Sequence, residues 1–206
     1  MSKILTARFL AALAALAIFA AAPRPATAQV VVGHTPETSP FHDITSSQRI
    51  TLFGGYFHGQ GDPLGTSPQS GPSVGLRYDL PVSGPADFYV RAQHVSSHRY
   101  AYDPTLPTGT RALGRQSLSL VSAELGFALN LTGRRTWHGL IPALGFGLGI
   151  VSAPGTTGKD PYTFGTQFEF SGTVGVRFNP SNSYELRVDA GPMFYQNHYP
   201  LAYFNA

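Results

Sequence analysis

The sequence lacks cysteine altogether and is poor in charge, with charged residues making up only 12% of its 206 positions. The absence of cysteine excludes disulfide scaffolds, cysteine-ligated metal centres and cysteine nucleophiles. Soluble domains carry about 25% charged residues, so this chain is depleted in them. Its hydrophobic fraction of 42% is too high for wholesale disorder. The length corresponds to one domain, or to two small ones.

Beyond the N-terminal residues 1–28, the chain has no net positive charge. The formal net charge of the whole chain is +3. Residues 1–28 contain Lys3, Arg8 and Arg24 and no acidic residue, so the charges of the remainder balance. A neutral chain without basic clusters lacks the electrostatic attraction that a phosphate backbone requires. We therefore expect no nucleic-acid partner.

The N-terminus has the three parts of a secretory signal peptide. Lys3 and Arg8 form a positive region, residues 9–22 are all apolar, and Ala26-Thr27-Ala28 has the small-x-small pattern that signal peptidase accepts. The apolar run is shorter than the about 20 residues that a membrane-spanning helix needs. We therefore expect cleavage after Ala28 and export of the mature chain.

From residue 49 onward, apolar and polar residues alternate with the period of two that is typical of strands. The alternation is clear where Val74, Leu76 and Tyr78 are separated by Gly75 and Arg77. No other stretch is a candidate membrane helix, so any span must be built from strands. Seven strands are predicted, at 49–59, 73–82, 87–98, 121–131, 140–150, 163–178 and 184–190.

The two faces of these strands predict their environment. One face is rich in Leu, Val and Phe and nearly free of charge, whereas the other combines small residues with charges of both signs. A soluble sandwich would expose Lys, Glu and Thr on its polar face. Small residues with matched charges instead fit the narrow interior of a small barrel. The predicted interior charges are Arg77, Asp79, Arg91, Glu124, Glu169, Arg177, Glu185, Arg187 and Asp189.

The links between the strands alternate in length, as short periplasmic turns and long external loops do in outer-membrane barrels. With the export signal, this pattern resembles the small eight-stranded outer-membrane β-barrel proteins, over residues 49–200. The resemblance implies an all-β, antiparallel up-and-down transmembrane β-barrel in the outer membrane of a Gram-negative cell. A secreted soluble β-sandwich is the alternative. The short links are 83–86, 132–138 and 180–183, and the long ones are 60–72, 99–116 and 153–162.

The expected organisation is a signal peptide at 1–28, a mostly irregular periplasmic lead-in at 29–48, and the barrel at 49–206. Barrels of this kind have an even number of strands, but only seven are clear. The family usually ends on Phe or Trp, whereas this chain ends on Ala206. Three explanations stay open: a truncated gene product, an irregular eighth strand at 196–206, or closure of the sheet by 29–33.

His94 and Ser96 are the candidate catalytic residues. Both lie on the outward face of the third predicted strand, near a long loop. This placement is similar to the His-x-Ser pair of the outer-membrane lipid A deacylases, eight-stranded barrels that hydrolyse an acyl ester. The resemblance implies that His94 is the base and Ser96 the nucleophile.

The surroundings of this pair depart from that family. Ser97 stands where the family usually has Asn, Asp103 lies within the loop, and Glu124 belongs to the inward face. A polar rim at the membrane interface is therefore the favoured interpretation of His94 and Ser96, and no catalytic residue is assigned.

No cofactor or metal is expected. His94 and His98 would lie about 13 Å apart along a strand, too far to share an ion. The glycines between Gly145 and Gly149 lack the GxGxxG spacing of a nucleotide loop, and small interior side chains explain them.

The expected function is therefore that of a structural or surface-interaction barrel with a charge-plugged interior and no catalytic activity. It would be embedded in outer-membrane lipid and would meet an extracellular partner through loops 60–72, 99–116 and 153–162. The alternatives are an outer-membrane lipid ester hydrolase using His94 and Ser96, and a narrow porin.

Overall fold

The computed structural model describes residues 39–44, 48–61, 65–103, 105–107, 109–154, 164–181 and 184–197, all of whose regular elements are strands. None of these residues forms a helix long and apolar enough to cross a membrane. The predicted signal peptide and its cleavage site lie outside the described residues. The strands are β1 (Phe41–Asp43), β2 (Arg49–Phe57), β3 (Gly71–Ser83), β4 (Ala86–Tyr102), β5 (Ala112–Asn130), β6 (Arg135–Trp137), β7 (Leu140–Ser152), β8 (Thr166–Ser181), β9 (Tyr184–Ala190) and β10 (Met193–Tyr195).

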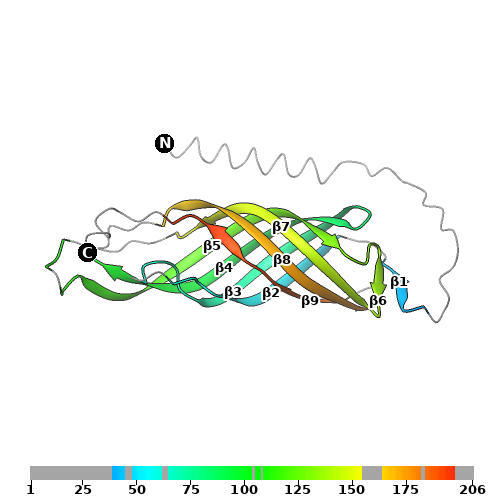
Figure 1. Ribbon diagram of the computed structural model, residues 1–206, viewed down its shortest axis with the longest axis horizontal. Coiled ribbons are helices and arrows are strands. Elements are labelled where there is room, and N and C mark those ends of the chain that lie inside the picture. The colour runs from blue at the N-terminus through cyan, green and yellow to red at the C-terminus, as the bar shows by residue number, and fades with distance from the viewer. Residues whose placement is uncertain are drawn as a thin grey trace. The chain divides into compact units, whose positions relative to one another are not determined.

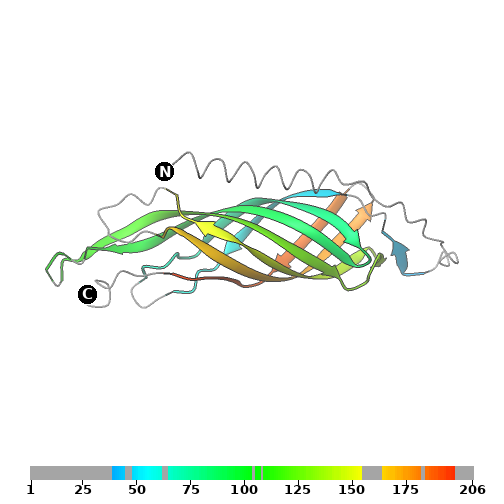
Figure 2. The same cartoon turned by 90° about the horizontal axis from the view of Figure 1, so that it is seen from above.

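The strands form one antiparallel up-and-down sheet in which neighbours along the chain are neighbours in space. The main series runs β2, β3, β4, β5, β7, β8 and β9, and every adjacent pair is antiparallel. Its strands are tilted and wrap around a common axis (Figure 1), and the view from above shows the same curvature (Figure 2). The predicted all-β, up-and-down fold with seven main strands is confirmed, and the sheet is barrel-like.

The two ends of this barrel-like sheet differ. At one end, here the turn end, tight links such as Gly84–Pro85 join the strands. At the other, the loop end, the longer links 58–70, 103–111 and 153–165 join them. The alternation of short and long links is the one that the sequence predicts.

The last strand of the series is longer than predicted. The pairings Val174 with Ala190 and Ser171 with Met193 keep one register, so β9 and β10 are a single strand interrupted at Gly191 and Pro192. Proline has no N–H to donate to a strand ladder. The Pro192 carbonyl nevertheless accepts a hydrogen bond from the Gly172 N–H (3.1 Å).

Among the described residues, no strand ladder joins the first strand of the series, β2, to the last, β9. The Arg49 guanidinium of β2 and the Glu185 carboxylate of β9 are 3.6 Å apart, so side chains connect these two strands near the turn end. Of the predicted closing segments, 29–33 lies outside the described residues, and so does 196–206 apart from Gln196 and Asn197, which form no strand.

The predicted loop 99–116 is wrong in extent, because β4 continues to Tyr102 and β5 begins at Ala112. The loop is reduced to residues 103–111. The hydrophobic alternation does not stop at residue 121 but changes phase there: Leu118 and Leu120 point inward and are buried, whereas Val121 points outward. Two adjacent apolar residues, Leu120 and Val121, break the period of two and hide the continuation of the strand.

The lead-in and one of the short links also contain strand structure. β6 lies within the predicted short link 132–138 and pairs with β1, which belongs to the N-terminal lead-in. Part of the lead-in is therefore attached to the turn end of the sheet. β6 joins β7 through His138 and Gly139, whose φ angles of 49° and 78° form the two-residue turn that matches the twist of a hairpin.

Candidate functional site

The outward face of the sheet is apolar over most of its height. Side chains there are large and well exposed; Leu52, for example, is 82% exposed and Phe146 58%. A contiguous apolar surface of this extent needs a covering medium or partner. Its members on the central strands are Val121, Leu125, Phe127, Leu129, Leu144, Phe146, Leu148, Ile150, Phe168, Phe170, Val174, Val176 and Phe178.

The inward face toward the turn end is filled with ion pairs. Arg177 is 1% exposed and contacts Asp87 (3.3 Å) and Glu185 (3.7 Å). Arg49 also approaches both acids, at 2.7 Å from Asp87 and 3.6 Å from Glu185. The Asn130 side-chain oxygen accepts a further hydrogen bond from Arg177. Each of these buried charges therefore has at least one partner, which offsets part of its desolvation cost.

A second group of charges lies beside the first. Arg77 donates to Asp79 (2.9 Å) and its guanidinium stacks 3.7 Å from the centre of the Tyr89 ring. Arg187, from β9, reaches the same Asp79 (3.6 Å) and also pairs with Asp189. The last strand of the series, β9, is thus linked through the interior to Asp79 on β3, the second strand.

Farther from the turn end, Arg91 pairs with Glu124 (2.7 Å), whose carboxylate also accepts a hydrogen bond from Ser171 (2.9 Å). Glycines on the inward face make room for these side chains. A Cβ atom on Gly147 would lie 2.7 Å from atoms of Glu124, Ser171 and Tyr89. The glycine series of β7 is therefore a requirement of interior packing.

All nine charges predicted for the interior are on the inward face. Five are essentially inaccessible, and Asp189 on the edge strand is the least buried. We call these nine residues, together with Arg49 and Asp87, the charged interior. The prediction missed Arg49 and Asp87, although both stand at odd-numbered positions, on the polar side of the alternation in their strands. The period of two already contains this signal, although each residue is only the first of its predicted strand, 49–59 or 87–98.

Toward the loop end, the interior contains an apolar cluster, beyond which Arg99 of β4 is also buried. Val95, Leu118, Leu120 and Val151 are each no more than 2% exposed and pack together. Phe164 covers them from the link before β8, with its ring 5.7 Å from that of Tyr195. We call the six residues of this cluster the apolar interior: Val95, Leu118, Leu120, Val151, Ala153 and Phe164.

The surroundings of His94 and Ser96 offer other partners. Both lie on the outward face of β4, but His94 Nε2 is hydrogen-bonded to Ser119 Oγ of β5 (2.5 Å). The two acids considered for the pair are engaged elsewhere. Glu124 is inside and bound by Arg91, whereas Asp103 accepts hydrogen bonds from Thr105 within the loop. No carboxylate of the described residues is thus placed to orient His94.

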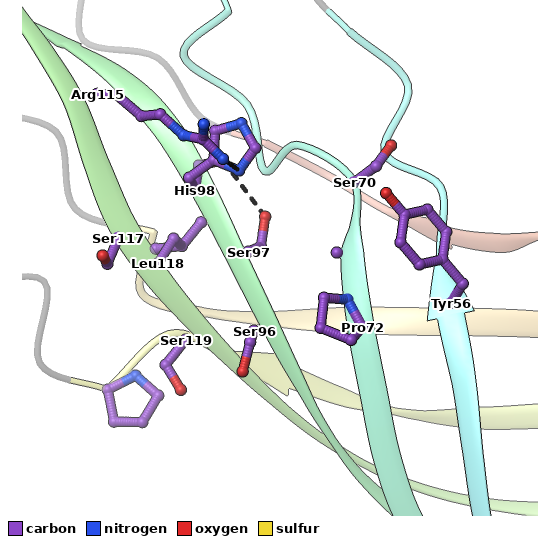
Figure 3. Close-up of a pocket in the computed structure, with 12 residues that line it drawn as sticks. Tyr56, Ser70, Pro72, Ser96, Ser97, His98, Arg115, Ser117, Leu118 and Ser119 are labelled. Atoms are coloured by element: carbon purple, nitrogen blue, oxygen red, sulfur yellow. Dashed lines mark hydrogen bonds between the residues drawn. The ribbon is translucent and has the colours of Figure 1, made fainter.

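A second feature of the outward face is a polar area at the loop end of β3, β4 and β5. It borders a hollow of about 830 Å³. Figure 3 shows Arg115 beside His98 on one side of the hollow, with Tyr56, Ser70 and Pro72 on the other. Arg115 Nη2 donates a hydrogen bond to His98 Nδ1 (2.8 Å). We call the seven residues Ser70, Pro72, Ser96, His98, Arg115, Ser117 and Ser119 the outer polar patch.

Comparisons with known proteins return no match: no family model, no curated protein and no solved structure is similar to this chain. Within the described segments, no group of three or more His, Asp or Glu side chains is arranged to hold a metal ion.

Proposed function

We propose that the chain is exported and inserts into the outer membrane of a Gram-negative cell as a β-barrel that presents its loops to the outside. The observation that carries this proposal is the inverted arrangement of the sheet, with charges buried inside and large apolar side chains exposed outside. In water this arrangement would leave a large apolar surface uncovered, whereas a lipid bilayer covers it.

The height of the apolar face supports the same proposal. On β5 the outward residues are apolar from Val121 to Leu129 and become polar at Ser119. A strand tilted in a bilayer needs about 9–11 residues to cross the hydrocarbon core. Aromatic side chains at the turn end, including Trp137 and Tyr184, are exposed on the same surface, as expected for an interfacial girdle.

The interior supports an anchoring role in preference to a pore. Arg177 and Arg187 pair with acids on strands that are not their neighbours, Arg91 pairs with Glu124 on the adjacent strand, and the apolar interior lies toward the loop end. A barrel of this size is just wide enough to be filled by its own side chains. We infer that the barrel serves as a rigid support, and that recognition of an external partner falls to the loops, above all residues 103–111 between β4 and β5.

Heat modifiability tests the proposal. The full chain is expressed with its N-terminal segment in a Gram-negative host, and its outer membranes are run unboiled and boiled on a denaturing gel. A faster unboiled band in the outer-membrane fraction is expected, because a closed barrel stays compact in the detergent. Folded, soluble protein in the periplasm would reject the proposal and favour the sandwich.

A further inference from the structure

The outer polar patch differs from the rest of the loop-end rim in the groups that it contains. On β7 and β8 the outward face is apolar up to Ile150 and Phe168 and ends on Ser152 and Thr166, whose hydroxyls are hydrogen-bonded to each other (3.2 Å). On β3–β5 the same face ends instead on serines together with His98 and Arg115. A polar rim marks the edge of the lipid on all strands, so it is the arginine and its neighbouring donors that need their own explanation.

The groups around the hollow are hydrogen-bond donors. Arg115 is exposed and carries a permanent positive charge. Because Arg115 donates to Nδ1 of His98, that ring is neutral and its Nε2–H is available as a donor. Within the described part of the chain, the hydroxyls of Ser96 and Ser117 have no hydrogen-bond partner, and no described carboxylate lines the hollow. A guanidinium surrounded by N–H and O–H donors is complementary to a phosphate group.

The position of the patch distinguishes a lipid phosphate from a free one. Along the same row of the sheet, Val74 and Val121 flank His94, directly on the turn-end side of the patch. The hollow thus opens where the apolar outward face ends. A lipid lying along this face would place its acyl chains against the valines and its headgroup at Arg115.

We propose that the outer polar patch binds the phosphate of a phosphorylated lipid headgroup, with the guanidinium of Arg115 as the principal contact. This inference rests on the proposed function, because it requires the apolar face below the patch to be covered by lipid. It assigns a site on the outward face of the sheet that is separate from the barrel interior.

The test uses the full chain inserted in phosphatidylcholine vesicles that contain either phosphatidic acid or diacylglycerol, two lipids that differ only in the phosphate. Lipid retained by the protein after mild detergent extraction is quantified. We expect preferential retention of phosphatidic acid, reduced about tenfold in Arg115→Gln, since one charge-assisted contact is lost. Ser117→Glu should reduce it as well, through repulsion. Arg135→Gln is the matched control, an exposed arginine at the turn end, and should retain phosphatidic acid like the wild type.

Several outcomes would overturn the inference. Equal retention of the two lipids would mean that the surface binds acyl chains only. Competition by inorganic phosphate, without selective retention of phosphatidic acid, would assign the site to the free anion. An equal loss in Arg115→Gln and Arg135→Gln would place the effect outside the patch. The unboiled gel band of each variant reports insertion separately, so a folded barrel without phosphate selectivity rejects this inference alone, whereas no inserted barrel rejects the proposed function too.

Discussion

The two halves of the barrel-like sheet follow opposite rules. Toward the turn end, the inward face carries the charged interior and the outward face is apolar. Toward the loop end, the inward face carries the apolar interior, and on β4 and β5 the outward face is polar. The second half is organised like a water-soluble β-barrel, and the first half is organised like a membrane-embedded one.

The change between the halves occurs within single strands, without a bulge or a break. In β5 the inward residue Leu120 is 1% exposed, whereas the next residue, Val121, is 42% exposed on the other face. Because side chains alternate strictly, the phase of the hydrophobic pattern must invert for this to happen. Under the proposed function, the inversion marks the height at which the strands leave the outer leaflet.

The largest loss of stability is expected when a buried arginine is removed from the charged interior, in the half toward the turn end. Arg177→Met leaves Asp87 and Glu185 with Arg49 as their remaining shared partner, and should cost about 3–5 kcal/mol. The measurement is the temperature at which half of the unboiled, fast-migrating band is lost. Arg177→Lys keeps the charge and should lose less. Wild-type stability in Arg177→Met would mean that the ion pairs do not hold the interior together.

The hydrophobic period of two explains which of these features the sequence predicts and which it does not. Alternation alone places Arg177 and Glu124 inside and Leu125 outside, because residues on one side of a strand share one environment. It could not find the strand residues 112–120, since the prediction assumed a single phase for each strand. It also could not find the hydrogen bond between His94 and Ser119, which depends on the register between two strands and not on spacing along one.

The outer polar patch was equally hidden from sequence reasoning. Arg115 lies within the predicted loop 99–116, and Ser117 lies between that loop and the predicted strand 121–131. Only the pairing of His98 with Ser117 brings the two residues next to β4. A search for a change of hydrophobic phase at Leu120 and Val121 would have recovered the end of the strand.

The second prediction compares one residue type in the two halves. Leu118→Ala opens a cavity in the apolar interior and should cost about 3 kcal/mol. Leu125→Ala, on the same strand but facing outward, removes no buried contact of that kind and should cost less. Conversely, Leu125→Arg should cost about 2–4 kcal/mol in vesicles if lipid covers this face. If Leu125→Arg were tolerated there, the face would be exposed to water, and the proposed inversion at the membrane boundary would be wrong.

A third prediction concerns the space for the buried charges. Gly147→Ala places a methyl group 2.7 Å from Glu124, Ser171 and Tyr89 and should cost about 1–3 kcal/mol, since the three side chains have to move. Gly172→Ala is the control, because a Cβ atom there meets nothing within 4 Å. The same melting assay separates the two. Equal loss in both variants would indicate a general effect of removing glycine from a strand and not a limit set by the charged interior.

The smallest effect is expected for an ion pair outside both halves. Arg135 and Asp43 connect β6 and β1 at the turn end, 3.2 Å apart, with side chains 56% and 65% exposed. Water screens this pair, so Arg135→Ala should change stability by less than about 1 kcal/mol. The interior pairs have little solvent around them, and their loss should therefore exceed this value clearly. A melting shift for Arg135→Ala as large as that for Arg177→Met would show that the attachment of β1 to β6, and not the charged interior, limits the stability of the turn end.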